Sequence, residues 1–285
     1  MSFIGILGSK TGVCGQLTEM MPPEAFGACY IEAFVGGAGV FYGKEPAKIN
    51  ILNDLDPDTV LMHQAIKRDF RAVEAELRVL LDDDWTFEEC KRLRESDEWD
   101  SIPEARRAAA VVYVYKQSVN SNQHVLSSSS KSHSSFNPNM SLEQYAKKLE
   151  RAQIRHFDYA KCIDVYFYRS PEVEGFVFGD PPYVIADKAM HYRFNFHPIE
   201  HIRFWHLMTR LNRDNGPKRN VKIMLTYDDD PLIRALYRES DDWRIRPLTI
   251  GYKSAHDPKR SRDEVAITNY DPPEIPVSGG DDENS

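Results

Sequence analysis

The chain has 285 residues, enough for one large α/β domain with an inserted lobe. Its composition, 41% hydrophobic and 28% charged, is that of a globular protein. No apolar run approaches the roughly 18 residues that span a bilayer. The N-terminal stretch also lacks the basic region that opens a signal peptide. These features predict a cytoplasmic protein with no membrane partner.

Charge is unevenly distributed along a chain whose net charge is -8. Residues 82–104 contain ten acidic and three basic side chains, and residues 271–285 contain five acidic side chains and no basic one. Residues 105–161 between them contain nine basic and three acidic side chains. Such a basic segment is typical either of a solvated helical face or of a surface that contacts nucleic-acid phosphates. The acidic tail is predicted to be disordered.

The cysteine and histidine patterns predict no metal site. The cysteines are far apart and form no CxxC pair, which argues against both a zinc knuckle and a disulfide framework. Four histidines fall close together, yet they do not form HExxH, and a helix face near a ligand is the preferred interpretation. The residues concerned are Cys14, Cys29, Cys90, Cys162, His191, His197, His201 and His206.

The hydrophobic pattern predicts α/β structure at both ends of the chain and a helical, loop-rich segment between them. The predicted strands are residues 30–34, 49–52, 163–168, 176–178, 221–226 and 264–270. The predicted helices are residues 57–81, 85–95, 198–211 and 231–237. The stretch 117–139 is polar and serine-rich, so it cannot form a core of its own and is predicted to be a loop.

Two features near the N-terminus predict a site for an adenosine-containing cofactor. The first predicted strand runs into Phe34-Val35-Gly36-Gly37-Ala38-Gly39, where glycine allows close approach of the backbone to a ligand. Asp54 lies 20 residues after Phe34, at the end of the next strand. A carboxylate there is placed to bind ribose hydroxyls, although an Asp at a strand end also often caps a helix. The loop is not GxGxxG, which disfavours NAD.

The third feature is Asp180-Pro181-Pro182-Tyr183, directly after the apolar run 176–178. A rigid strand exit would also explain this string. In a chain that already has a nucleoside-type glycine loop, it instead indicates a catalytic motif.

With these three features in this order, the sequence resembles the Dam-type (D12 class) DNA adenine-N6 methyltransferases over about residues 5–270. Glu32 to Gly39 resembles the family's cofactor motif, Asn53-Asp54 resembles its acidic strand end, and Asp180 to Tyr183 matches its catalytic motif. The family's opening motif is replaced by Leu7-Gly8-Ser9-Lys10, and its recognition hairpin by a serine-rich stretch around 127–136. No target sequence is therefore carried over.

The resemblance implies a Rossmann-like core, S-adenosylmethionine as cofactor and double-stranded DNA as partner. It places the cofactor on Lys10, Phe34, Val35, Gly36, Gly37, Gly39, Asp54 and Asp180, and the chemistry on Asp180, Pro181, Pro182 and Tyr183. The Asp180 carboxylate and the Pro181 carbonyl would accept the hydrogens of the adenine amine. Tyr183 would stack on an adenine flipped out of the duplex.

The insert supplies the candidates for DNA contact. Lysines are expected at phosphates and asparagines at adenine edges, although the same residues are also typical of a solvated loop. The candidates are Lys116, Asn120, Asn122, Lys131 and Ser132.

The predicted organisation is a catalytic core formed by residues 1–60 and 160–270, a helical insert with a recognition loop at 61–159, and the tail 271–285. The protein is expected to be a monomer or a weak dimer in a bacterial or phage-infected cell. Its role would be restriction–modification, host marking or phage protection. The alternatives are methylation of adenine in RNA and a catalytically silent cofactor or nucleic-acid binder. Cytosine-N4 chemistry is disfavoured, since it more often has Ser in place of Asp180.

Overall fold

The computed structural model describes residues 13–83, 85–117, 141–169, 173–184, 196–238, 242–248 and 264–273. These residues form a seven-stranded sheet in the order β3-β2-β1-β4-β5-β7-β6. Its strands are β1 (Cys29–Glu32), β2 (Ile49–Asn53), β3 (Ala152–Arg155), β4 (Val173–Gly179), β5 (Arg219–Asp228), β6 (Arg244–Leu248) and β7 (Glu264–Thr268). β3, β2, β1, β4 and β5 pair in parallel, whereas β7 is antiparallel to both β5 and β6.

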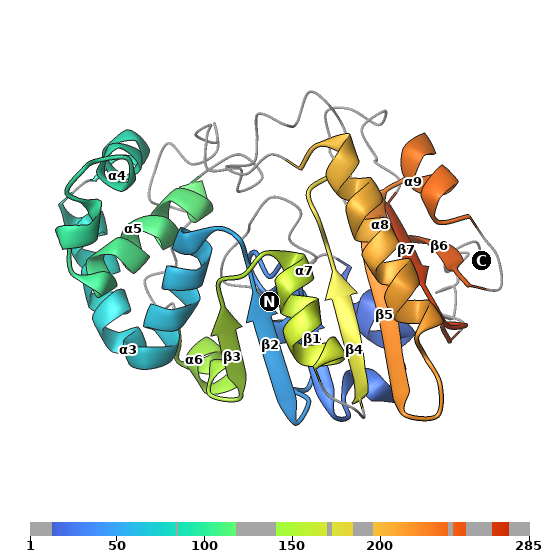
Figure 1. Ribbon diagram of the computed structural model, residues 1–285. Coiled ribbons are helices and arrows are strands. Elements are labelled where there is room, and N and C mark those ends of the chain that lie inside the picture. Colours follow the sequence, from blue (N-terminus) through green and yellow to red (C-terminus); the bar gives the residue numbers. More distant parts are fainter. Residues whose placement is uncertain are drawn as a thin grey trace, which may run out of the picture.

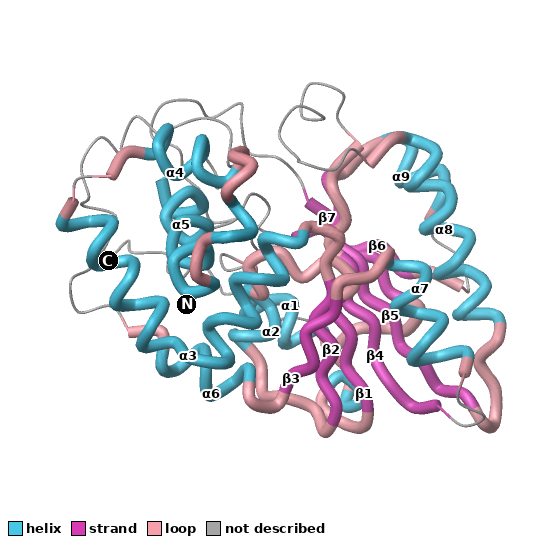
Figure 2. The backbone as a smooth tube through the Cα atoms, turned by 60° about the vertical axis from the view of Figure 1, so that its left-hand side comes forward, coloured by secondary structure: helices cyan, strands magenta, loops and turns pink. Residues whose placement is uncertain are grey.

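Helices cover both faces of the sheet (Figures 1 and 2). One face packs against α1 (Cys14–Met20), α2 (Gly39–Gly43), α3 (Pro57–Asp82) and α6 (Glu143–Leu149). The other packs against α7 (Tyr159–Ile163), the π-helix η7 (Asp164–Tyr168), α8 (Pro198–Arg213) and α9 (Pro231–Leu236). Short 3₁₀ turns lie at η2 (Pro23–Ala25) and η3 (Trp99–Ser101).

The alternation of side chains along each strand builds a separate core on each face. On β4, Phe176 and Phe178 join the core beneath α1 to α6, while Val177 between them joins the core beneath α7 to α9. This is the period of two that a strand buried on both faces requires. A mainly parallel sheet covered by helices on both faces confirms the predicted Rossmann-like α/β class.

A helical lobe projects beyond the β3 edge of the sheet (Figure 1). It consists of the distal half of α3, α4 (Phe87–Arg94) and α5 (Glu104–Gln117). α3 bends at Asp69, whose backbone is non-helical at φ -153°, and the Asp69 carboxylate accepts a hydrogen bond from the Ala72 N–H at 3.1 Å. The bend lets one long helix leave the sheet and pack along α5.

Three parts of the predicted pattern differ from the structure. Residues 163–168 were predicted to be a strand, but they form the end of α7 and the π-helix η7. β3 and β6 were not predicted. β3 lies inside the range 61–159 that was assigned to the insert, yet it pairs with β2, so these four residues belong to the main sheet. The predicted loop at 117–139 and tail at 271–285 lie almost wholly outside the described residues.

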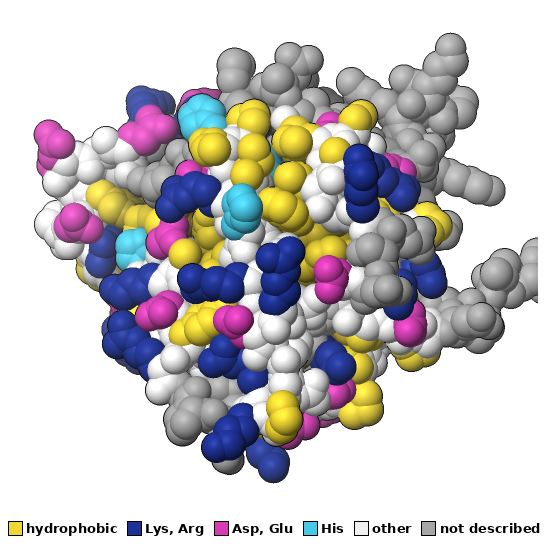
Figure 3. Space-filling view, turned by 45° about the vertical axis from the view of Figure 1, so that its right-hand side comes forward, with side chains coloured by type: hydrophobic (Ala, Val, Ile, Leu, Met, Phe, Trp, Pro, Cys, Tyr) yellow, Lys and Arg dark blue, Asp and Glu magenta, His cyan; other side chains and the backbone are white. Residues whose placement is uncertain are grey.

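The surface shown in Figure 3 has mixed character. Basic and acidic side chains are interspersed over its lower part, and hydrophobic side chains gather in its upper part. The layer of α7, α8 and η7 contains exposed ion pairs of Arg203 with Glu200 and Arg169 with Asp164, which add little to stability because water screens them. Across the described ranges, no helix combines the length and the apolar character needed to cross a membrane.

Candidate active site

The sheet places the three sequence motifs together, beyond the carboxyl ends of neighbouring strands. The strand order reverses between β1 and β4, which lie side by side with Ile31 opposite Val177. In an open parallel sheet, ligands bind beyond the carboxyl ends of the strands at such a reversal. The glycine loop follows β1, Asp54 follows β2 and Asp180 follows β4, so all three lie beyond the carboxyl ends of these parallel strands.

The glycine loop makes a tight turn from β1 into α2. Gly36 has φ 45°, and Ala38 adopts the left-handed region at φ 54° and ψ 32°. The turn is closed by a hydrogen bond from the Ala38 N–H to the Val35 carbonyl at 2.7 Å. The Val35 N–H donates to the Asn53 carbonyl at 2.8 Å, which joins the loop to the end of β2. A side chain at Gly36 would be strained by this backbone, so glycine is favoured there.

Asp54 connects the end of β2 to the glycine loop. Its Oδ2 accepts the Gly36 N–H at 2.9 Å and its Oδ1 accepts the Asp56 N–H at 2.9 Å. Burial raises the pKa of the Asp54 carboxyl to about 6, against the lowering effect of these two backbone donors. The alternative role of a helix cap belongs to Asp56 instead, whose carboxylate accepts the Asp58 N–H at the start of α3.

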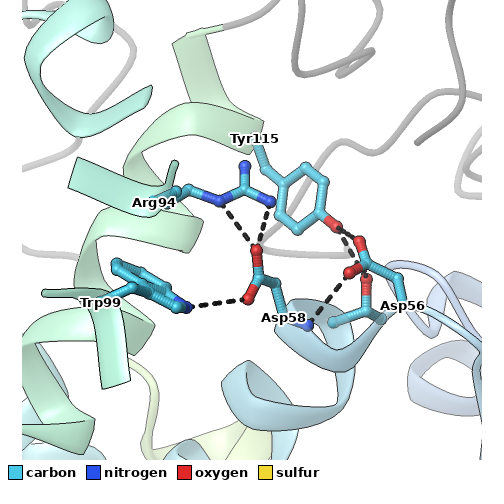
Figure 4. Close-up of polar contacts among 6 residues, drawn as sticks. Asp56, Asp58, Arg94, Trp99 and Tyr115 are labelled. Carbon is cyan, nitrogen blue, oxygen red and sulfur yellow. Dashed lines mark hydrogen bonds and ion pairs between the residues drawn. The ribbon is translucent and has the colours of Figure 1, made fainter. Parts of the chain in front are cut away.

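A buried polar cluster anchors the lobe to the first turn of α3 (Figure 4). The Arg94 side chain of α4 donates to Asp58 Oδ2 through Nε at 3.0 Å and Nη2 at 2.7 Å, and the Trp99 indole donates to Oδ1 at 3.3 Å. On α5, the Tyr115 hydroxyl donates to Asp56 Oδ2 at 3.2 Å. The same first turn of α3 therefore contacts Asp54 on one side and the lobe on the other.

Asp180 stands directly after β4, half-buried, next to β5. The Thr226 hydroxyl, which is fully buried on β5, donates to Asp180 Oδ1 at 2.8 Å. This contact agrees with the sheet register, since Gly179 lies opposite Leu225 in the last pair of β4 and β5, and Asp180 and Thr226 are the next residues. A neighbouring strand thus helps to fix the direction of the carboxylate.

The other end of the motif is held by β7. Tyr183 is 9% exposed, and its hydroxyl donates to Glu264 Oε1 at 3.0 Å. Pro181 is buried and Pro182 half-buried between the two fixed ends. Because proline locks φ and donates no N–H, the backbone between Asp180 and Tyr183 has little freedom.

Aromatic side chains surround the half-buried Phe34 ring. Its centroid lies 5.2 Å from Phe204, 5.5 Å from Tyr159 and 5.7 Å from Phe196. Phe204 and Phe196 meet the ring edge-on, a favourable geometry for aromatic pairs. The packing holds the start of the glycine loop against α7 and α8.

Glu32, the last residue of β1, is a buried acid near this edge. It is 2% exposed, and the Tyr30 hydroxyl donates to its Oε1 at 2.6 Å. Burial raises the pKa of the Glu32 carboxyl to about 7, and the nearby Lys44 ammonium opposes this rise. Burial lowers the pKa of Lys44 to about 8, and its ammonium lies 4.0 Å from the centroid of the Tyr30 ring.

The structure brings together the predicted residues after β1, β2 and β4 and leaves the predicted DNA contacts undescribed. Lys116 lies in the last turn of α5, but its side chain is outside the described part. The others that fall outside it are Lys10, Asn120, Asn122, Lys131 and Ser132.

The histidine cluster is divided in the fold. His191 is outside the described residues, and His201 is buried with its Nδ1 3.4 Å from the Tyr227 hydroxyl. Burial lowers the pKa of His201 to about 4. Among the described residues, no group of three or more His, Cys, Asp or Glu side chains is placed to hold a metal ion.

Three residues at the site were missed from the sequence: Thr226, Glu264 and His63. Thr226 on β5 and Glu264 on β7 bind Asp180 and Tyr183 through their side chains, from positions more than 40 residues further along the chain. His63 lies on α3 and contacts the Gly36 carbonyl. No local pattern marks any of them, although Thr226 and Glu264 both stand in strands that the sequence predicted.

Three features lie where the strand order of the sheet reverses: a glycine loop, an acidic residue at a strand end and an Asp-Pro-Pro-Tyr motif. This combination is typical of methyltransferases that use a nucleoside cofactor. The family model for D12 class N6 adenine-specific DNA methyltransferases matches residues 7–249, and the chain belongs to this family. The predicted family membership is thereby confirmed. The chain is a DNA adenine-N6 methyltransferase, and DNA is its substrate.

Individual relatives agree with this family. The chain is 26% identical over 250 residues to the type II methyltransferase M.MjaIII of Methanocaldococcus jannaschii, covering 79% of this chain and 83% of the relative. It is 25% identical over 249 residues to the DNA N-6-adenine-methyltransferase of Escherichia phage P1, covering 85% of this chain but 31% of that protein. A solved structure of a conserved hypothetical protein from Streptococcus pyogenes matches over 90% of this chain and 94% of its own, at 12% identity, but with a TM-score of 0.39.

Proposed function

We propose that the chain transfers a methyl group from S-adenosylmethionine to the N6 amine of an adenine flipped out of double-stranded DNA. The observation that carries this proposal is the placement of Asp180, fixed by Thr226 at the end of β4, beside the glycine loop that follows β1. Donor and acceptor sites on adjacent strands bring the two substrates together, which is most of what a direct transfer needs.

The cofactor side of the site fits an adenosine-containing methyl donor. Gly36 leaves the loop open to close approach, and the Asp54 carboxylate keeps lone pairs beyond the two backbone donors that it already accepts. In this proposal Phe34, Val35, Gly37 and Gly39 shape the loop, and Asp54 accepts the ribose hydroxyls. When bound, S-adenosylmethionine supplies an electrophilic methyl group on a positively charged sulfur.

The acceptor side activates a poor nucleophile. The lone pair of the adenine amine is delocalised into the ring, so the nitrogen attacks only as it becomes tetrahedral. The Asp180 carboxylate and the Pro181 carbonyl accept the two amine hydrogens and favour that geometry. Tyr183 presents its ring to the flipped base, while its hydroxyl is held by Glu264.

DNA recognition is assigned to the lobe and to the segment that follows α5. Among the proposed contacts, Lys116 and Lys131 meet phosphates, Asn120 and Asn122 meet adenine edges, and Ser132 lies beside Lys131 in the sequence. We assign residues 1–60 and 160–270, together with β3, to catalysis, and the helical lobe with the segment that follows α5 to recognition. The protein would work in the cytoplasm as a monomer or weak dimer, without a metal.

The test is methyl transfer from isotope-labelled S-adenosylmethionine to unmethylated duplex DNA, followed by digestion to nucleosides. Label in N6-methyladenine that is lost in Asp180→Ala supports the proposal. The matched control is Asp164→Ala, which removes an exposed carboxylate paired with Arg169 and is expected to keep activity. Label in RNA alone would move the acceptor to RNA. Cofactor binding without label in either would identify a silent binder.

A further inference from the structure

Gly36 is held from two sides, through the peptide before it and the peptide after it. The Gly36 N–H donates to Asp54, and the Gly36 carbonyl lies 2.8 Å from Nε2 of His63. His63 is on α3, fully buried, two turns after the helix begins. The resemblance to known methyltransferases assigns no role to this histidine, and the catalytic proposal above does not use it.

The protonation state of His63 follows from its partners. A carbonyl oxygen can only accept, so Nε2 must carry the hydrogen and donate it to Gly36. Burial lowers the pKa of His63 to about 4, so the ring is neutral at neutral pH and Nδ1 is an acceptor. The Tyr42 hydroxyl lies 3.2 Å from Nδ1 and must therefore be the donor there. Burial raises the pKa of Tyr42 well above its usual value, which keeps that hydroxyl protonated.

Tyr42 is itself fixed in place. Its ring meets Tyr145 of α6 edge-on at 4.8 Å, and its carbonyl accepts a hydrogen bond from Lys148 at 2.7 Å. The contacts from Tyr42 through His63 to Gly36 therefore link the packed helix α2 to the glycine loop. Only one tautomer of the imidazole satisfies both ends.

This contact sets the orientation of the next amide. The Gly36 carbonyl and the Gly37 N–H belong to one planar trans peptide and point in opposite directions. Because His63 holds the carbonyl toward α3, the Gly37 N–H is turned away from α3. With φ at 45° and no side chain on either glycine, the peptide has several accessible orientations when this hydrogen bond is absent.

We propose that His63 is a positioning residue for the cofactor loop, which holds the Gly36–Gly37 peptide in the orientation that receives S-adenosylmethionine. This inference rests on the proposed cofactor site. In this role His63, which lies outside the glycine loop, pre-organises that loop for the cofactor. Loss of the His63 side chain should therefore lower the affinity for S-adenosylmethionine more than it lowers kcat.

The test measures the Kd of S-adenosylmethionine by calorimetry for the full chain and three variants. His63→Leu removes the donor and is expected to weaken binding at least tenfold. His63→Gln keeps an N–H that can reach the carbonyl and is expected to recover most of that loss. Tyr42→Phe removes only the group that selects the tautomer and is expected to weaken binding about threefold.

The matched control for Tyr42→Phe is Tyr113→Phe. Tyr113 is also buried, and its hydroxyl donates at 2.6 Å to the Trp85 carbonyl in the lobe. Each variant loses one hydrogen bond of a buried tyrosine hydroxyl, so a general loss of packing would raise the Kd of both variants equally. The expected result is a change for Tyr42→Phe and none for Tyr113→Phe. If His63→Leu does not fold, the Kd values of Tyr42→Phe, Tyr113→Phe and His63→Gln still test whether the hydrogen bond from His63 supports cofactor binding.

The outcomes separate this inference from the proposed function. Unchanged affinity in a folded His63→Leu variant, or equal effects of the two tyrosine variants, would overturn the role of His63 while leaving the cofactor assignment intact. Failure of the unmodified chain to bind S-adenosylmethionine would overturn the cofactor assignment and this inference with it. A kcat that falls while the Kd stays constant would place His63 in the chemical step and contradict the proposal.

Discussion

The Thr226 hydroxyl donates to Oδ1 of Asp180 across 2.8 Å, from a strand 46 residues further along the chain. Thr226 is fully buried and Asp180 is half-buried, so the hydrogen bond is shielded at one end and reaches the site at the other. It restricts the rotation of the Asp180 carboxylate, to which we assign the activation of the adenine amine.

Thr226→Val is expected to lower kcat by about 10- to 100-fold with little change in the Kd of S-adenosylmethionine. The reason is that a hydrogen bond to a charged group contributes about 1.5–3 kcal/mol, and valine keeps the shape of threonine without its hydroxyl. Single-turnover methylation of duplex DNA measures the effect. Thr226→Ser keeps the donor and should retain most of the rate. An equal loss in both variants would show that packing on β5, not the hydrogen bond, matters.

Tyr183 is expected to act through its ring more than through its hydroxyl. Tyr183→Ala should weaken productive DNA binding by about 10- to 100-fold, since stacking of a base on an aromatic ring contributes about 1–3 kcal/mol. Tyr183→Phe loses the 3.0 Å bond to Glu264 but keeps the ring, so its kcat/KM for DNA should stay within several-fold of the wild type. Steady-state methylation of one duplex by both variants makes the comparison. Similar losses in both would assign the main role to the Glu264 contact instead.

The pH dependence of cofactor binding is expected to report on Asp54. Burial raises its pKa to about 6, so the carboxylate is ionised above that pH and becomes protonated below it. If the ionised form accepts the ribose hydroxyls, affinity is full well above pH 6, has begun to fall at pH 6, and drops by at most tenfold per unit below it. Titration of the Kd from pH 5 to pH 8 measures this.

Asp54→Asn is the control for that titration. The variant should bind S-adenosylmethionine more weakly at pH 8 and should lose the inflection near pH 6. Glu32 titrates nearby with a pKa of about 7, so an inflection that persists in Asp54→Asn belongs to Glu32. An Asp54→Asn curve identical to that of the wild type would remove Asp54 from the cofactor site.

Much of the central fold could be predicted because its strands have local signals. The runs that became β1, β2, β4, β5 and β7 are short, apolar and bounded by glycine, proline or acidic residues. β3 and β6 gave no such signal, since Ala152–Arg155 and Arg244–Leu248 mix charged with apolar residues at the two edges of the sheet. Edge strands are half-exposed, and pairing with a neighbour rather than composition makes them strands.

The error at 163–168 has a readable cause. Aromatic and β-branched residues there favour a strand by propensity, yet the buried positions are Tyr159, Cys162, Ile163 and Phe167. Spacings of three and four residues are those of one helical face. The spacing of the buried residues predicts a helix better than residue propensity does. That spacing can be recognised only when residues 159–162, before the apolar run, are considered together with it.

The catalytic motif could be predicted as a string, but the groups that hold it could not. Thr226 and Glu264 reach Asp180 and Tyr183 because β5 lies between β4 and β7 in a fixed register. Strand order and register are tertiary properties, so no spacing along the chain reveals them. The same holds for His63, whose contact with Gly36 depends on how α3 packs against the loop.

The Asp58–Arg94 pair is expected to be a major source of stability for the lobe. Its side chains are 3% and 8% exposed, respectively. Asp58→Asn or Arg94→Met leaves a buried charge without its partner, which costs about 3–5 kcal/mol of unfolding free energy. Urea denaturation followed by tryptophan fluorescence measures this, since Trp99 donates to the same carboxylate. The matched control is Arg169→Met, which should give no measurable shift in the urea midpoint, because the side chains of Arg169 and its partner Asp164 are 70% and 50% exposed. Equal stability of Arg94→Met and Arg169→Met would show that the cluster in Figure 4 does not anchor the lobe, and that apolar contacts between α3 and α5 suffice.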